Sequence, residues 1–146
     1  NLMLACDVVY AVDKARFAQS FAKVGLIPDC GGLYFLPKAV GLHKAKELMF
    51  TADLIGAEEA AALGMLNYVC SEDKLAEDVY AMAQRLAVSA PLSIGLIKKY
   101  LNNTSLGLDE ILVAEESTQA LLMDTEDCRE GIAAFKEKRN PVFTGK

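Results

Sequence analysis

The sequence predicts an α/β fold that gives way to a region built only of helices. Segments with strand and helix character alternate over residues 1–70, whereas residues 71–146 carry apolar side chains at helical spacing alone. Hydrophobic residues make up 53% of the 146 residues, which is enough for a packed core and too many for a disordered chain. We therefore expect two regions, 1–70 and 71–146.

Local patterns predict each element of the first region. Residues 1–6 are expected to end a helix, and residues 24–32 form a loop rich in glycine and proline. Runs of β-branched and aromatic residues predict strands at 7–12, 15–19 and 66–70. Helices are expected from the loop to about residue 40, at 44–51 and at 57–63. Gly64 follows the last of these, at a position that needs a left-handed backbone.

The second region should contain four helices. The first carries Leu75, Val79, Met82 and Leu86 on one face, and the second begins at Pro91, which suits a first turn. The third spans 108–123, and Thr125 caps the fourth, which ends near residue 139. These apolar faces are broader than four short helices can bury against one another, so we expect a homo-oligomer.

Composition excludes some classes of function. The net charge of −5 disfavours nucleic-acid binding, and no apolar run approaches the roughly 18 residues of a membrane span. The four cysteines are scattered, without a C-x-x-C pair, and His43 is the single histidine, expected on a helix surface, so we expect no metal site. We expect reduced thiols in the core of a cytoplasmic protein that binds neither nucleic acid nor membrane.

The loop at residues 22–32 holds the candidate catalytic residue, Asp29. Leu26 and Ile27 form an apolar stretch before it, and a carboxylate beside such a wall resists ionisation, which suits a base that removes a proton next to a carbonyl. Asp is also a preferred helix N-cap, and this second role is the commoner one for an Asp in front of a helix. The residues alone leave both roles open.

Several motifs resemble the crotonase (enoyl-CoA hydratase/isomerase) superfamily, and the likeness runs in order through nearly the whole chain. They are the segments 7–11, 15–17, 25–32, 36–41, 55–60 with 64–66, 129–135 and 137–139. The Pro-Asp-Cys-Gly-Gly loop and the closing residues 141–146 look most like the epoxyphenylacetyl-CoA isomerase branch. The resemblance implies the C-terminal half of the family's ββα spiral over 1–70, followed by a helical trimerisation region over 71–146. It also implies a trimer or a dimer of trimers.

The resemblance also implies site residues. Hydratases of the family use two glutamates to activate water, and their positions fall on Asn1 and Phe21, which cannot do so. The isomerase branch places a single acid at the position of Asp29. The resemblance therefore implies an isomerase that takes a proton from C2 of a 3-enoyl-CoA and returns it at C4.

Further residues are expected to bind substrate. Asn1 could position it by a hydrogen bond, and Phe21 either lines the acyl pocket or belongs to the core. The loop contributes Leu26, Ile27, Pro28 and Gly31. In the family an aromatic at the position of Phe135 and a lysine at that of Lys138 approach the nucleotide of coenzyme A. The alternative for Lys138 is solvent and the helix dipole.

The predicted function is an acyl-CoA isomerase that shifts a double bond from C3 to C2, with epoxyphenylacetyl-CoA to oxepin-CoA as a further reaction. Coenzyme A enters as part of the substrate, and no other cofactor is expected. One alternative is a hydratase or other lyase of the family, and another is a non-catalytic acyl-CoA-binding or assembly module. The family's two oxyanion-binding N–H groups fall before residue 1, so we expect the chain to be part of a longer polypeptide.

Overall fold

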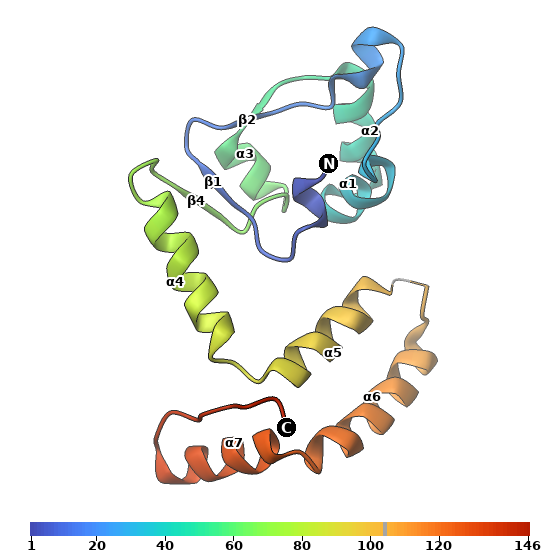
Figure 1. Cartoon of the computed structure of the whole chain (residues 1–146). Helices are drawn as coiled ribbons and strands as arrows, with labels where there is room; N and C mark the ends of the chain where they lie inside the picture. Colours follow the sequence, from blue (N-terminus) through green and yellow to red (C-terminus); the bar gives the residue numbers. More distant parts are fainter. Residues whose placement is uncertain (104) are drawn as a thin grey trace. The chain divides into compact units, whose positions relative to one another are not determined.

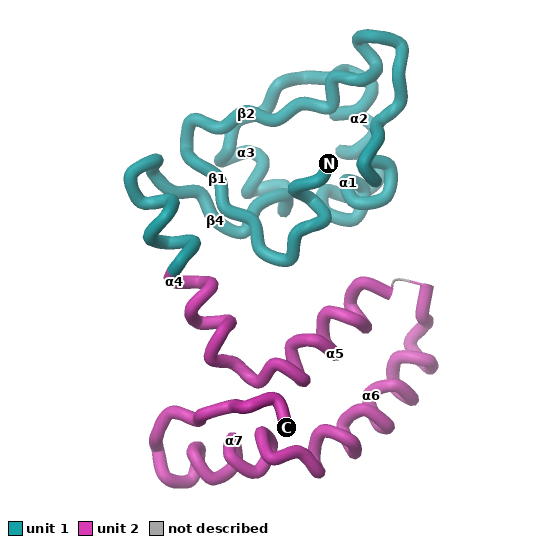
Figure 2. Tube along the Cα trace, viewed as in Figure 1, with its two compact units in different colours: residues 1–80 teal, residues 81–146 magenta. Residues whose placement is uncertain are grey.

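The structure is a computed structural model that describes residues 1–103 and 105–146. The chain forms two compact units, Asn1–Tyr80 and Ala81–Lys146 (Figure 2). The sequence predicts a change from mixed to purely helical structure between residues 70 and 71. The two units are defined by contacts and not by secondary structure, so the predicted boundary stays a prediction.

The first unit contains short strands, short helices and two 3₁₀ turns (Figure 1). In chain order the elements are η1 (Met3–Ala5), β1 (Tyr10–Val12), β2 (Arg16–Phe17), η2 (Ser20–Val24), α1 (Gly32–Val40), α2 (Leu42–Thr51), β3 (Ile55–Gly56), α3 (Ala57–Ala62) and β4 (Tyr68–Cys70). The next helix, α4 (Leu75–Ala87), begins in this unit and ends in the second. The α/β class is confirmed, although helices predominate and the strands are shorter than predicted.

The strands form two separate pairs. β1 runs parallel to β4, with Tyr10 opposite Tyr68, and β2 runs antiparallel to β3. The rings of Tyr10 and Tyr68 stack with centroids 4.7 Å apart, which supports this register. Asn67 precedes β4 and accepts a hydrogen bond from the Val9 N–H at 2.7 Å, so the entry into β1 is held by a side chain. Because parallel strands need a long connection, α1, α2 and α3 lie between β1 and β4 in the sequence.

The core of the first unit lies where α1, α2 and α3 pack on the strands. Leu36 of α1 is completely buried, and Leu48 of α2 is 4% exposed. The remaining core members come from the strands, from α2 and α3, and from residues next to these elements: Val9, Ala11, Ala45, Ile55, Ala57, Ala60, Met65 and Leu66. This core sets the position of the loop that enters α1.

Two sequence predictions about local backbone are confirmed at helix ends. Gly64 follows α3 with φ +85°, and a Cβ there would lie 2.9 Å from the carbonyl oxygen of Ala39. The Thr125 hydroxyl accepts a hydrogen bond from the Cys128 N–H at 3.1 Å and caps the helix that follows. A 3₁₀ turn, η2, lies between the strand predicted to end at residue 19 and the loop predicted from residue 24, and it stops at Gly25 with φ +75°.

The second unit holds the end of α4 and three further helices: α5 (Pro91–Asn102), α6 (Leu108–Met123) and α7 (Glu126–Glu137). None of the residues in α4, α5 or α6 is buried. Apolar side chains such as Ile97, Leu101 and Leu112 are more than half exposed. The prediction that these helices cannot bury their apolar faces against one another agrees with this exposure; the oligomer itself stays a prediction.

The last residues of the chain fold back along α7. The buried Asp127 carboxylate accepts hydrogen bonds from the N–H groups of Thr144 and Gly145, at 2.7 and 2.9 Å. The Asp127 N–H in turn donates to the carbonyl oxygen of Lys146 at 3.1 Å. The C-terminal tail follows the end of α7 and is held by hydrogen bonds to the first turn of that same helix.

One prediction about the cysteines is wrong. Cys6 and Cys30 are exposed, and Cys70 and Cys128 are half-buried, so the described part of the chain does not bury its four thiols in a core. Within that part, no helix is both long and apolar enough to cross a membrane. No group of three side chains there is arranged to hold a metal ion.

Glu130 of α7 forms an ion pair with Arg139, which follows the end of that helix. Glu130 accepts hydrogen bonds from the Arg139 guanidinium, at 2.5 and 2.8 Å, and from the Val142 N–H at 2.9 Å. The Arg139 bonds and then the Val142 N–H lower the pKa of Glu130 from 4.5 to about 2. A carboxyl group with a lowered pKa stabilises the fold above its unfolded pKa and loses that effect as protons bind.

We therefore expect part of the acid sensitivity to come from Glu130. Its contribution should be complete above about pH 4.5 and should disappear as the pH falls toward about 2. The measurement is the melting temperature against pH for the complete protein and for Glu130→Gln. The gap between the two curves should narrow through this window, and a gap that stays constant would contradict the assignment.

Candidate active site

Asp29 lies in a tight turn that leads directly into α1. The Gly32 N–H donates to the Asp29 carbonyl oxygen at 2.8 Å, and both residues between them have left-handed backbones, with φ 46° at Cys30 and 78° at Gly31. Positive φ at both central positions is typical of a type I′ turn. Gly31 also has no room for a side chain, because a Cβ would lie 2.7 Å from the Phe35 ring. The backbone at Asp29 is therefore tightly defined.

The alternative role of Asp29 as a helix cap is wrong. The N-cap of α1 is Gly31, whose carbonyl oxygen accepts from the N–H groups of Tyr34 and Phe35, and no side chain caps this helix. The Asp29 carboxylate therefore takes no part in capping α1. Its side chain is exposed in the chain described here.

The side chain of Asn1 holds the turn from the other side. Its Nδ2 donates to the Asp29 carbonyl oxygen at 3.0 Å. The amide also covers Gly32 so closely that a Cβ there would lie 2.5 Å from Asn1 Cγ. Asn1 and Asp29, two residues that the sequence predicted for the site, are therefore brought together.

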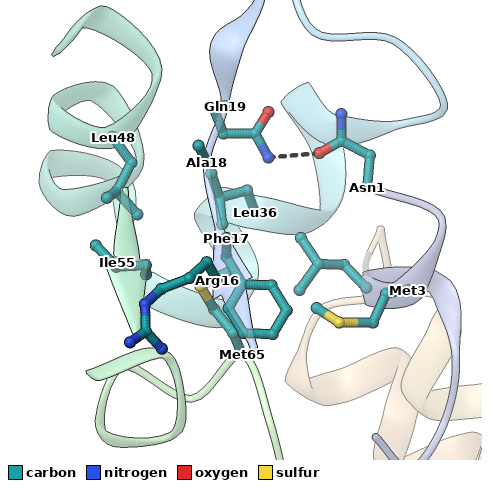
Figure 3. Close-up of a pocket in the computed structure, with 11 residues that line it drawn as sticks. Asn1, Met3, Arg16, Phe17, Ala18, Gln19, Leu36, Leu48, Ile55 and Met65 are labelled. Carbon is teal, nitrogen blue, oxygen red and sulfur yellow. Dashed lines mark hydrogen bonds between the residues drawn. The ribbon is translucent and has the colours of Figure 1, made fainter. Parts of the chain in front are cut away.

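Beside this contact is a cavity of about 280 Å³ in the first unit (Figure 3). Gln19, which is 8% exposed, donates from Nε2 to Asn1 Oδ1 at 2.6 Å across its rim. Apolar side chains make up most of the wall: Met3, Leu4, Phe17, Leu36, Leu48, Ile55 and Met65. Arg16 contributes the charged group, and its guanidinium donates to the carbonyl oxygens of Lys14 and Ala15.

Cys30 interacts with the Asp29 carboxylate. A hydrogen bond from the thiol to Asp29, together with the negative charge of that carboxylate, raises the pKa of Cys30. Cys30 is therefore kept as a thiol rather than a nucleophilic thiolate. The turn thus offers one carboxylate with a neutral donor beside it.

The apolar wall predicted around Asp29 is not formed by this chain. Leu26 and Ile27 are 63% and 74% exposed, and Pro28 is half-buried. The sequence places these residues next to Asp29, but an apolar stretch desolvates a carboxylate only where other residues cover it. Phe21 is half-buried in η2 and does not line the cavity beside Asn1.

The two residues expected near the nucleotide lie in the other unit. Phe135 is 86% exposed on α7, and Lys138 is exposed at the C-cap of that helix with φ 56°. Their neighbour Arg139 is engaged by Glu130 and Glu137. Lys138 and Phe135 therefore stay predictions as nucleotide contacts.

Sequence reasoning did not identify Gln19 as part of the site. It follows a two-residue strand and was predicted only as a strand end. A buried glutamine has no local signature, because its importance here comes from Asn1, which lies 18 positions away. The available signal was modest: a polar residue between the apolar Phe17 and Phe21.

Comparison with known proteins identifies the family of the chain. The family model described as "Enoyl-CoA hydratase/isomerase" matches residues 1–146, and the chain belongs to this family. It is 39% identical to a 1,2-epoxyphenylacetyl-CoA isomerase from Escherichia coli K12, over all of this chain and 56% of that protein. It is 38% identical to a trans-2-decenoyl-[acyl-carrier-protein] isomerase from Streptococcus mutans, again over all of this chain and 56% of that protein.

The fold agrees with solved structures of the family. An enoyl-CoA hydratase from Bacillus anthracis superposes with a TM-score of 0.93 at 33% identity, over 98% of this chain and 56% of that one. The crotonase-type fold is thereby confirmed. The chain spans a little over half the length of these relatives, and the assignment to their C-terminal half and its oligomerisation region is not confirmed.

Proposed function

We propose that the complete protein is an acyl thioester isomerase of the enoyl-CoA hydratase/isomerase family, with Asp29 as the proton-transferring base. The observation that carries this proposal is the Asp29 turn. Its carboxylate caps no helix, while its main chain is held by Gly32 and Asn1. A base needs this combination, because its carboxylate must keep a lone pair available for the proton and its position must be constant.

The reaction needs one carboxylate and no further reagent. Asp29 takes a proton from C2 of a 3-enoyl thioester, and the electron pair of that C–H bond delocalises into the thioester as an enolate. The double bond then moves from C3–C4 to C2–C3 as the enolate collapses, and Asp29 returns the proton to C4. All atoms of the substrate stay in the product.

Two relatives support this reading of the chemistry by their printed names, since both are isomerases of unsaturated or epoxidised acyl thioesters. One name specifies coenzyme A and the other an acyl-carrier protein. We favour coenzyme A, because Phe135 and Lys138 match residues that approach its nucleotide in the family. A soluble cytoplasmic trimer or dimer of trimers is part of the proposal, and the exposed apolar faces of α5 and α6 support the oligomer.

Hydration is the second candidate function, because the Bacillus anthracis relative is described as a hydratase. Against it, Asn1 and Phe21 stand where the family's water-activating glutamates are expected, and neither side chain can accept a proton from water.

The test supplies the complete protein with a 3-enoyl-CoA and, separately, with crotonyl-CoA. We expect a conjugated 2-enoyl product from the first substrate, seen by its thioester absorbance and by mass, and no addition of water to the second. A 3-hydroxyacyl product at a comparable rate would favour the hydratase. Binding of either thioester without turnover would favour the acyl-CoA-binding module.

A further inference from the structure

Gln19 presents an unusual combination of burial and incomplete hydrogen bonding. Its side chain is 8% exposed, its Nε2 donates to Asn1 Oδ1 at 2.6 Å, and its Oε1 has no partner among the described residues. A buried amide oxygen without a partner costs free energy that a leucine of similar size would not. Such a cost calls for a compensating role.

The orientations of the Asn1 and Gln19 side-chain amides follow from the main-chain carbonyl group of Asp29. The Asp29 carbonyl oxygen accepts hydrogen bonds and cannot donate them, so Asn1 must present Nδ2 to it. Asn1 Oδ1 then faces Gln19, which must present Nε2. If either amide were rotated to exchange its oxygen and nitrogen, two acceptors or two donors would face each other. The unpaired Oε1 is therefore the far end of a directed relay.

We propose that Gln19 is a positioning residue, which acts through Asn1 to hold the main chain of Asp29 in place for proton transfer. The relay spans two hydrogen bonds, of 2.6 and 3.0 Å, and ends on the carbonyl oxygen that also closes the turn with Gly32. This inference rests on the proposed role of Asp29 and adds two residues that support it.

The relay makes a specific prediction for Gln19→Leu in the complete protein. Leucine fills a similar space and removes the unpaired Oε1, which offsets the loss of the hydrogen bond to the half-buried Asn1 Oδ1, so the melting temperature should change little. Turnover of the 3-enoyl-CoA should nevertheless fall about tenfold in kcat, with KM unchanged within about twofold, because the loss concerns alignment rather than binding. A purely structural glutamine would not separate stability from activity in this way.

A double-mutant cycle with Asn1→Leu tests whether the two residues act as one device. If they do, the double variant should be no slower than the slower single variant. Gln84→Leu, at an exposed glutamine of α4, is the matched control and should leave kcat unchanged. Losses that multiply in the double variant would overturn the relay.

Gln19→Glu adds a rescue by pH. A protonated glutamic acid donates to Asn1 Oδ1 as the amide does, whereas the ionised form only accepts. The ratio of its kcat to that of the unmodified protein should therefore rise as the pH falls through the pKa of the new carboxyl group. Using the ratio removes the pH dependence that is common to both proteins, and a flat ratio would contradict the relay.

Hydrogen exchange separates failure of this inference from failure of the proposed function. The N–H groups of Gly32, Tyr34 and Phe35 report on the turn, since all three bond to carbonyl oxygens of Asp29 or Gly31. They should exchange faster in Gln19→Leu than in the unmodified protein, whatever the reaction catalysed. Unchanged exchange in Gln19→Leu would overturn the relay. Faster exchange in Gln19→Leu, together with full activity of an Asp29→Asn variant, would support the relay and refute the role of Asp29 as the base.

Discussion

Replacing Asp29 with Asn should lower turnover of a 3-enoyl-CoA by about 100- to 10,000-fold, the range usual for a general base. The amide has the shape of the carboxylate but cannot accept a proton at neutral pH. The turn itself should survive, because its hydrogen bonds go to the Asp29 carbonyl oxygen and not to its side chain. Steady-state kinetics of the complete protein should show the loss in kcat, with the melting temperature retained.

The matched control is Asp53→Asn, which makes the same change at an exposed position outside the site. It should leave kcat within about twofold of the unmodified protein, as expected for a surface substitution. Full turnover by the Asp29 variant would mean that another group moves the proton. The isomerase mechanism proposed for this chain would then be wrong.

Among the substitutions considered for this chain, Leu36→Ala should cause the largest loss in the free energy of unfolding, about 2–5 kcal/mol. Leu36 is the largest side chain in the described chain that is fully buried, and it also forms part of the wall of the cavity beside Asn1. Removal of its branched end enlarges an existing space, which the surrounding helices can fill only in part. The free energy of unfolding of the complete protein, from denaturant titration, gives the measurement.

Leu33→Ala is the control within the same helix. Leu33 lies in α1 three residues before Leu36 and is 55% exposed. The two variants have the same change in helix propensity, so the difference between them isolates burial. Equal losses at both positions would show that Leu33 is covered in the complete protein or that Leu36 is not the centre of this core.

Much of the secondary structure could be predicted from the sequence, because its signals are local. The Gly64 and Thr125 predictions were correct since a left-handed residue after a helix and a hydroxyl before one depend on neighbours within four positions. The strands were predicted too long. A strand extends only as far as its partner, and β2 has just the two-residue β3 beside it.

The site was predicted in part. Asp29 was named from its loop and from resemblance to the family, and Asn1 from the resemblance alone. The structure joins them by a hydrogen bond, while their roles in catalysis and substrate binding remain predictions. The apolar wall from Leu26 and Ile27 was inferred from adjacency alone, and both side chains are exposed here. Adjacency in sequence does not decide burial in a loop, which depends on what else packs there.

By itself, the sequence determined the family, the order of helices and strands, and the loop that carries the one acid expected to act as base. These are properties of short motifs, whose physical meaning lies in neighbouring residues. Only the tertiary structure decided that Asp29 caps no helix and that Gln19 and Asn1 direct a relay onto its carbonyl oxygen. Hydrogen bonds between residues far apart in the chain follow from how α1, β2 and the first residues pack together, and no local pattern encodes that arrangement.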